Sequence, residues 1–189
     1  LSNATQITKG THRINGFSIS PNGTKIAYSK TTEKNSNIYT THIDGGEKKQ
    51  VTFFKASHCS APSWSPDGKN IAFVLLEEGK NSVWTINLET GKKHQFKETF
   101  VSQSLSLKYL PTGEILYQKL RNQNFIILNP ETEEQRDLLE DETMGWPFNA
   151  YFSPNMKNLA MFWNRQLDYN SEEYMDGRGI WLIPNNETL

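Results

Sequence analysis

The histidines and the single cysteine are the side chains of this sequence that could bind a metal or act as a nucleophile. The four histidines are His12, His42, His58 and His94, and no two of them lie two or four residues apart. Two ligands on one strand or helix need such a spacing to reach one zinc ion. The histidines therefore predict no chelate. Cys59 follows His58 directly, which would allow a reactive thiol, although a lone cysteine in a loop is more often incidental.

An acidic segment, Asp168 to Glu173, carries carboxylate and amide oxygens of the kind that bind calcium. A calcium loop of the familiar helix-loop-helix type needs glycine at its sixth position and glutamate at its twelfth. This segment lacks the glycine, and its twelfth position is Gly179. The simpler interpretation is a solvated acidic loop. We therefore predict neither a metal nor any other cofactor.

The sequence has none of the common catalytic or nucleotide-binding motifs. There is no Gly-x-Ser-x-Gly elbow, because the segment that starts Gly16-Phe17-Ser18 lacks the second glycine. A phosphate-binding loop and a dinucleotide fingerprint are also missing. These observations predict a protein that is not an enzyme by itself.

Charge and hydropathy exclude two further classes of partner. Twenty Lys and Arg residues face 21 Asp and Glu, which gives a net charge of −1. Such a balance gives no electrostatic reason to expect nucleic-acid binding. The longest apolar run, Ile71 to Leu76, is much too short to cross a bilayer as a helix. We predict no nucleic-acid partner and no membrane insertion.

Four copies of one pattern form the framework on which all these residues lie. Each copy is an apolar strand, a turn of the type Pro-Asx-Gly and a second apolar strand. The turn residues supply a fixed φ and a positive φ, which a tight hairpin requires. The fourth copy has Met156 in place of the glycine, so its turn should be strained or differently shaped. The prolines recur every 43 to 45 residues, at Pro21, Pro66, Pro111 and Pro154.

A third strand with a turn-forming cluster follows each hairpin, and a short fourth strand follows in three copies. Four short antiparallel strands at this period are typical of a β-propeller blade. A β-sandwich with coincidental turn spacing is the alternative, and the regular recurrence of both motifs argues against it. We predict an all-β propeller, a single domain over residues 1–189, with blades at about 14–54, 60–98, 104–140 and 148–189 plus 1–9.

The best-formed copy resembles a known family. It reads Ser65-Pro-Asp-Gly-Lys69 before Ile71-Ala-Phe73, and then Val83-Trp-Thr-Ile-Asn-Leu-Glu-Thr-Gly91. These stretches resemble the WD-like propeller repeats of TolB and its relatives, and the resemblance covers nearly the whole chain. It implies a propeller fold and a periplasmic or extracytoplasmic location. Such repeats occur in TolB, in the propeller domains of prolyl-oligopeptidase-like peptidases and beside bacterial signalling domains.

The two ends of the chain have complementary phases. Residues 1–8 resemble the end of a blade, and the last copy stops after its third strand. We therefore expect Thr5 to Thr8 to pair beside Ile180 to Ile183 and close a ring of four blades, which would remove exposed edges. The other possibility is that these are four blades of a longer protein, since TolB-like propellers commonly have six.

The candidate recognition residues lie on one face of the expected propeller. The Pro-Asx-Gly turns belong to one face and look structural, whereas the blade-to-blade links and second-to-third-strand loops form an irregular face. That face carries an insertion, 164–178. Loops on a rigid scaffold are common binding sites, and Trp, Tyr and Arg dominate hot spots. The candidate site is His12, Arg13, His58, Trp146, Arg165, Tyr169 and Tyr174.

The expected function is a non-enzymatic scaffold that binds a protein, peptide or glycan through the irregular face. An alternative for Trp146 is that it only packs beneath the insertion and holds it in place. An alternative for the whole chain is an accessory or sensor propeller of a larger peptidase or signalling receptor. A third hypothesis, an enzyme with a carboxylate or histidine site in the central funnel, has the least support.

Overall fold

The computed structural model describes residues 4–10, 12–102, 107–120, 124–138, 146–153, 155–164 and 178–184, and of 146–149, 163, 164, 178 and 184 only the backbone. Every regular element within these residues is a β-strand, which confirms the all-β prediction. No helix in the described part of the chain is long and apolar enough to cross a membrane.

The strands form four repeat units, which are named units 1 to 4 in chain order. Unit 1 contains β1 (Arg13–Ile19), β2 (Lys25–Thr31), β3 (Ser36–His42) and β4 (Lys48–Gln50). Unit 2 contains β5 (His58–Trp64), β6 (Asn70–Glu77), β7 (Lys80–Asn87) and β8 (Lys93–Gln95). Unit 3 contains β9 (Lys108–Tyr109), β10 (Ile115–Gln118), β11 (Phe125–Leu128) and β12 (Gln135–Asp137). Unit 4 contains β13 (Trp146–Phe152), β14 (Asn158–Asn164) and β15 (Arg178–Pro184).

Consecutive strands within each unit pair antiparallel, as the repeat predicts. The turn that begins at the repeated proline joins the first two strands of each unit, and it reads Pro-Asx-Gly in units 1 and 2, Pro-Thr-Gly in unit 3 and Pro-Asn-Met in unit 4. In unit 1 the Gly23 amide donates to the Ser20 carbonyl (2.8 Å), and Gly23 has a φ of 71°. In unit 4 Met156 holds the same position at a φ of 59°, where a side chain is disfavoured. Of the two expected outcomes, a strained turn or a different shape, the described residues keep the shape and place Met156 at a positive φ.

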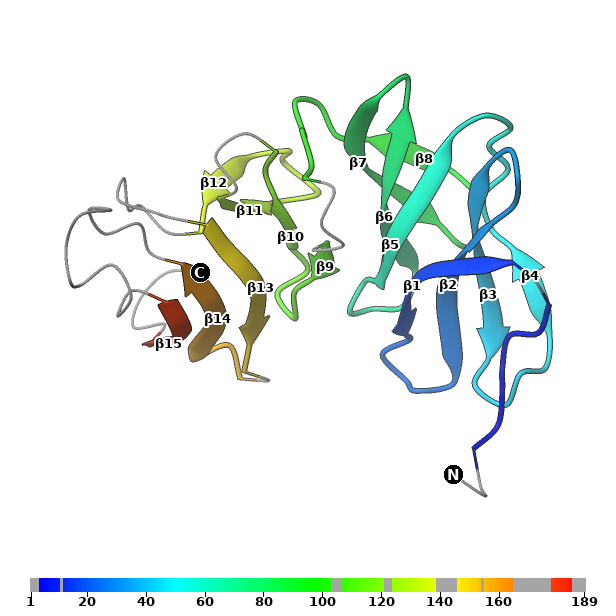
Figure 1. Ribbon diagram of the computed structural model, residues 1–189, viewed down its shortest axis with the longest axis horizontal. Coiled ribbons are helices and arrows are strands. Elements are labelled where there is room, and N and C mark those ends of the chain that lie inside the picture. Colours follow the sequence, from blue (N-terminus) through cyan, green and yellow to red (C-terminus); the bar gives the residue numbers. More distant parts are fainter. Residues whose placement is uncertain are drawn as a thin grey trace.

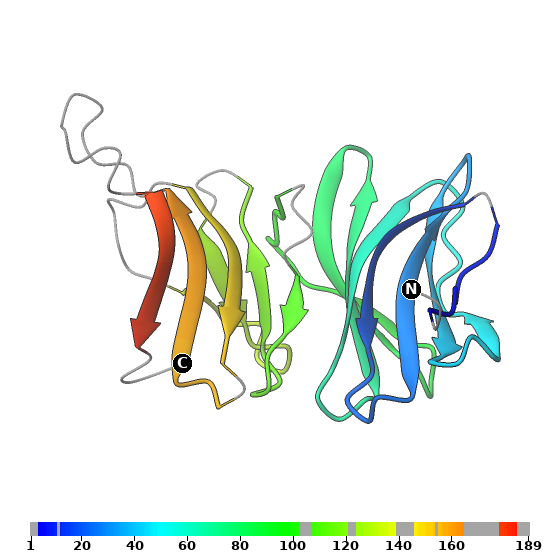
Figure 2. The ribbon, with the colours of Figure 1, turned by 60° about the horizontal axis from the view of Figure 1, so that its bottom comes forward.

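The units pack face to face and bury one apolar core between each neighbouring pair. The first core, between units 1 and 2, includes Ile38 and Phe73; the second, between units 2 and 3, includes Val83 and Tyr117; the third includes Met161. Figures 1 and 2 show the four units side by side in an open arc, with unit 1 at one end and unit 4 at the other. Alternating apolar residues on each strand therefore give every inner unit two buried faces.

Units 1 and 2 are also joined through their backbones. β3 and β5 form a parallel bridge at Ser36 and His58, which merges the two units into one eight-stranded sheet. The buried hydroxyls of Ser29 and Ser36 both donate to the Cys59 carbonyl oxygen, the first at 2.7 Å. Units 3 and 4 are separate sheets within the described residues.

The expected closure by the N-terminal segment is not found. Thr5 to Thr8 form no strand, and Ile7 lies instead at the β3–β4 turn, where a Cβ added to Gly45 would be 3.7 Å from it. The described strands of unit 4 end with β15 at the sheet edge, and Ile180 on it is 83% exposed. The reason is geometric, because units 1 and 4 lie at opposite ends of the arc (Figure 1).

Candidate functional site

The two ends of the strands differ in character. The Pro-Asx-Gly turns lie together at one end of the units, and the β2–β3 and β6–β7 loops lie at the other (Figure 2). We call these the turn end and the loop end. The predicted separation into a regular face and an irregular face is therefore present across the described units.

Three of the predicted site residues lie at the loop end of units 1 and 2. The pairing partners Arg13, Thr31, Ser36 and His58 follow one another across β1, β2, β3 and β5, so they form one row at that end. A cleft of about 650 Å³ is lined by His12, Arg13 and residues 31–35. His58 is exposed but does not line it. The structure thus brings His12 and Arg13 together and leaves His58 outside the cleft.

The other four predicted residues are not placed as a cluster. The backbone of Trp146 begins β13 and pairs with Asn164. Arg165, Tyr169 and Tyr174 lie outside the described residues. Their shared surface with Trp146 therefore remains a prediction.

Sequence reasoning missed three exposed apolar side chains at the loop end. Phe53 is 68% exposed, Phe100 is 51% exposed, and Leu120 lies beside Phe100, since its amide donates to the Phe100 carbonyl (2.8 Å). Phe53 and Phe100 each follow a buried threonine, Thr52 or Thr99. The hydroxyl of each threonine accepts a hydrogen bond from a backbone amide of the third strand in its unit, β3 or β7. This repeated Thr-Phe pair in the links was the available signal.

Cys59 is buried within the first core, so the reactive-thiol hypothesis finds no support. Its side chain has no exposed surface, and burial raises the pKa of the thiol to about 12. A thiol must ionise and be reached in order to react. The neighbouring His58 is exposed, whereas Cys59 is buried, so the two residues do not share one environment.

We expect Cys59 to resist alkylation in the folded chain and to react once the chain unfolds. At pH 8 a thiol with a pKa near 12 is ionised in only about one molecule in ten thousand. Iodoacetamide labelling followed by mass spectrometry should give almost no adduct in buffer and one adduct in guanidinium chloride. Labelling in buffer at the rate of free cysteine would contradict the buried position.

No metal centre is assembled in the described residues. Within them, no three His, Cys, Asp or Glu side chains lie close enough together to hold one ion. The Nε2 atom of His94 instead lies 3.1 Å from Oε1 of Glu133, and both side chains are exposed. The acidic segment from Asp168 to Glu173 lies outside the described residues.

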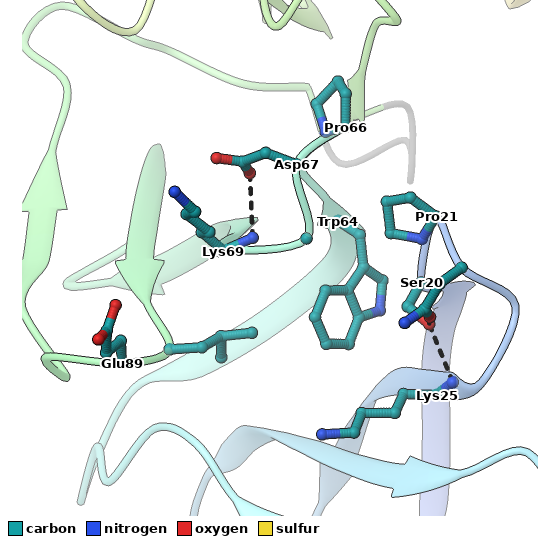
Figure 3. Close-up of a pocket in the computed structure, with 11 residues that line it drawn as sticks. Ser20, Pro21, Lys25, Trp64, Pro66, Asp67, Lys69 and Glu89 are labelled. Atoms are coloured by element: carbon teal, nitrogen blue, oxygen red, sulfur yellow. Dashed lines mark hydrogen bonds between the residues drawn. The ribbon is translucent and has the colours of Figure 1, made fainter.

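The turn end carries a second cleft, of about 630 Å³, between the first two Ser-Pro-Asx-Gly turns (Figure 3). We call it the turn groove. Pro21 and Pro66 come from the two turns, and the Trp64 indole lines the cleft next to Ser20. Leu88 and Glu89 contribute from the β7–β8 turn. The sequence analysis treated these turns as structural only, because a turn motif does not reveal the space between two turns.

The turn groove is lined by two lysines, Lys25 and Lys69, and two carboxylates, Asp67 and Glu89. The Asp67 carboxylate accepts from the Ser65 hydroxyl (2.6 Å) and the Lys69 amide (3.0 Å), and these bonds hold its pKa below the ordinary value. The equivalent residue of the first turn is the neutral Asn22, beside Lys25. Within the described residues neither Lys25 nor Lys69 forms an ion pair.

The family of the chain follows from this repeat and from its match to a known domain. The model of the TolB beta propeller domain matches residues 2–162. The chain belongs to the TolB beta propeller family. No curated protein matches its sequence.

Solved structures support the same fold for this TolB-type chain. TolB from Acinetobacter baumannii has a TM-score of 0.71 at 18% identity, with 94% of this chain and 45% of that chain covered. A TolB candidate from Agrobacterium tumefaciens has a TM-score of 0.66 at 18% identity, with 89% and 64% covered. A puromycin-hydrolyzing peptidase from Mycobacterium tuberculosis has a TM-score of 0.68 at 12% identity, with 85% and 27% covered.

These likenesses establish the fold alone, because all three identities are low. The chain spans less than half of the Acinetobacter TolB and about two thirds of the Agrobacterium protein. Each of those structures contains much that this chain does not match.

Proposed function

We propose that this chain is a non-enzymatic binding domain of extracytoplasmic location, and that the loop end of its units binds a protein. The observation that supports it best is a set of exposed apolar side chains, two on consecutive links and one on the adjoining β10–β11 loop. Phe53 and Phe100 are held at the loop end by links that the buried Thr52 and Thr99 anchor, and Leu120 is hydrogen-bonded to Phe100 through its amide. Exposed aromatics on a rigid frame are typical of recognition surfaces, since they bury much area at low entropic cost.

The proposed site extends across the same end to the residues chosen from the sequence. His12, Arg13 and His58 add polar and cationic groups beside the apolar ones. The backbone of Trp146 pairs with Asn164 at the end of β14, and Arg165, Tyr169 and Tyr174 follow Asn164 in the sequence. A polar rim around an apolar centre is the usual arrangement of a protein interface.

The experiment is to isolate a binding partner with the wild-type chain and to measure its affinity for surface variants. We expect Trp146→Ala and Phe100→Ala each to weaken binding by about 2 kcal/mol, roughly thirtyfold, with little change in Tm. The control is Ile43→Ala, which removes an exposed apolar side chain just after β3, toward the turn end. A Trp146→Ala variant that loses stability but binds normally would contradict the recognition role and favour packing.

The runner-up function is that of an accessory propeller in a peptidase or receptor. The similarity to the Mycobacterium tuberculosis peptidase, of which 27% is covered, favours it. This hypothesis expects a hydrolase or signalling domain elsewhere in the full-length protein, whose activity changes when residues 1–189 are deleted. A full-length protein with no such domain would leave the binding scaffold as the better account. The full-length sequence would also show how many blades the propeller has.

A further inference from the structure

We propose that the outer side of unit 1 carries a binding site for a tetrahedral oxyanion, a phosphate or sulfate group. The site is a small cavity between the N-terminal segment and the sheet of unit 1, which we call the lysine cavity. It shares one residue with the candidate surface chosen from the sequence, so the proposal goes beyond protein binding and can fail without it. The polar side chains that line the cavity are Thr8, Lys9, His12, Tyr28, Lys30 and Lys48.

The sheet of unit 1 directs these side chains away from unit 2. Ala27 lies in the core between units 1 and 2, and side chains alternate along a strand, so Tyr28 faces the other way. Lys30 is two residues further along β2 and shares that outer face, and Lys48 reaches the same cavity from β4. Residues 7–10 lie over this face and add the third lysine; Figure 2 shows them in dark blue at the outer edge of the arc.

The lysine cavity gathers positive charge from three separate segments. Its lining contains Lys9, Lys30 and Lys48 and no carboxylate. Among the described residues none of these three lysines forms an ion pair, and the Lys30 ammonium lies 5.5 Å from the centre of the Tyr39 ring. The turn groove differs, because its two lysines are balanced by two carboxylates. A cavity lined by one sign of charge attracts counter-ions, so this one favours an anion.

Two hydroxyl groups at the cavity can add hydrogen bonds to that charge. Tyr28 is only 4% exposed, and its ring stacks on Tyr39 with the centroids 5.8 Å apart. Burial and the neighbouring Tyr39 raise the pKa of Tyr28, so its hydroxyl keeps the proton and can donate. Thr8 supplies a second hydroxyl from the N-terminal segment. Hydrogen bonds to a charged acceptor are stronger than those between neutral groups.

The size of the cavity selects the kind of anion. Its volume is about 60 Å³, and a water molecule takes up about 30 Å³ of the liquid. A phosphate or sulfate group fits this space, whereas a nucleoside or a sugar ring must stay outside. Lysine acts as a point charge without the planar fork of arginine, so it suits an anion whose oxygens point in several directions. A phosphate group carries nearly two charges at pH 7, which matches several cations better than one carboxylate does.

The experiment is an NMR titration of the chain with inorganic phosphate at constant ionic strength. We expect the amides of Gly10 and Lys30 to shift and to saturate, while the amides of Thr112 and Gly113 in unit 3 stay in place. Sulfate should shift the same amides, and acetate should bind at least about fivefold more weakly, because it carries one charge and two oxygens.

Two neighbouring lysines on β4 provide a matched pair of variants. Lys48→Gln should weaken phosphate binding by about fivefold or more. Lys49→Gln removes the same charge from the next residue, which is also exposed but points to the opposite face and does not line the cavity, so binding should change by less than about twofold. Both side chains are exposed, so the Tm of either variant should match that of the wild type.

Three outcomes would overturn the proposal. Equal losses in Lys48→Gln and Lys49→Gln would mean diffuse attraction by the net charge of the surface. Shifts that grow with phosphate and never saturate would mean that no site exists, and acetate that binds as tightly as phosphate would refute the tetrahedral dianion. A parallel titration with glycerol phosphate identifies the source of the group: equal or tighter binding supports a phosphate ester, and binding of inorganic phosphate alone supports the free ion.

Discussion

Phe73→Ala should lower the free energy of unfolding by about 3–5 kcal/mol, because it empties the centre of the core between units 1 and 2. Phe73 has no exposed surface and packs against Phe54, with ring centroids 6.3 Å apart. A domain of this size has only about 5–15 kcal/mol of stability in total. The expected drop in Tm is therefore about 6–20 °C, measured by thermal and urea unfolding.

Phe53→Ala is the matched control for this substitution. It removes the same side chain from a position that is 68% exposed, so the free energy of unfolding should change by less than about 0.5 kcal/mol. Similar losses in the two variants would mean that Phe53 is also covered in solution. A small loss in Phe73→Ala would mean that units 1 and 2 do not pack as described.

Thr52→Val should cost about 2–3 kcal/mol of stability although the two side chains have nearly the same shape. The buried Thr52 hydroxyl accepts from the Ile38 amide (2.8 Å) and donates to Asn37 Oδ1 (2.9 Å). Valine would leave the Ile38 N–H buried without an acceptor and would remove one donor from the Asn37 amide group. Leaving a buried polar group unsatisfied is more costly than losing the bond itself.

Thr52→Ser keeps the hydroxyl and removes one methyl group, so it separates the hydrogen bonds from the packing. We expect it to cost about 1 kcal/mol or less. Urea unfolding of both variants gives the comparison. If the serine variant is the less stable of the two, then packing of the methyl group, and not the hydroxyl network, holds the link in place.

The repeat made most of the fold predictable from the sequence. Regularly spaced prolines, alternating apolar strands and the departure at Met156 are local signals, and the described units have their strands and the positive φ at Met156 where the repeat places them. The position of the N-terminal segment was not predictable, because complementary phases do not determine which edge a segment meets. Ile7 lies at the β3–β4 turn, and no local pattern encodes that contact.

The candidate sites were less accessible from sequence for a physical reason. A cleft exists only between elements, so the turn groove requires two turns that are 45 residues apart to face each other. The exposed Phe53 and Phe100 were different, since the repeated Thr-Phe pair would have marked them. The recognition role of Trp146, Arg165, Tyr169 and Tyr174 stays a prediction from the sequence.

The parallel bridge between β3 and β5 has a consequence for how the chain opens. An array of repeats gains its stability from each repeat and from each interface, and its parts can open separately. Units 1 and 2 share one sheet and two hydroxyl bonds to the Cys59 carbonyl. The link into unit 3 meets unit 2 through one longer backbone bond, from the Val101 amide to the Asn81 carbonyl (3.3 Å), and units 3 and 4 share the third core. Backbone amides at the start of β3 and in β5 should therefore exchange with deuterium last, and those of β15 first. Opening then proceeds along the arc from unit 4 toward a lasting pair of units.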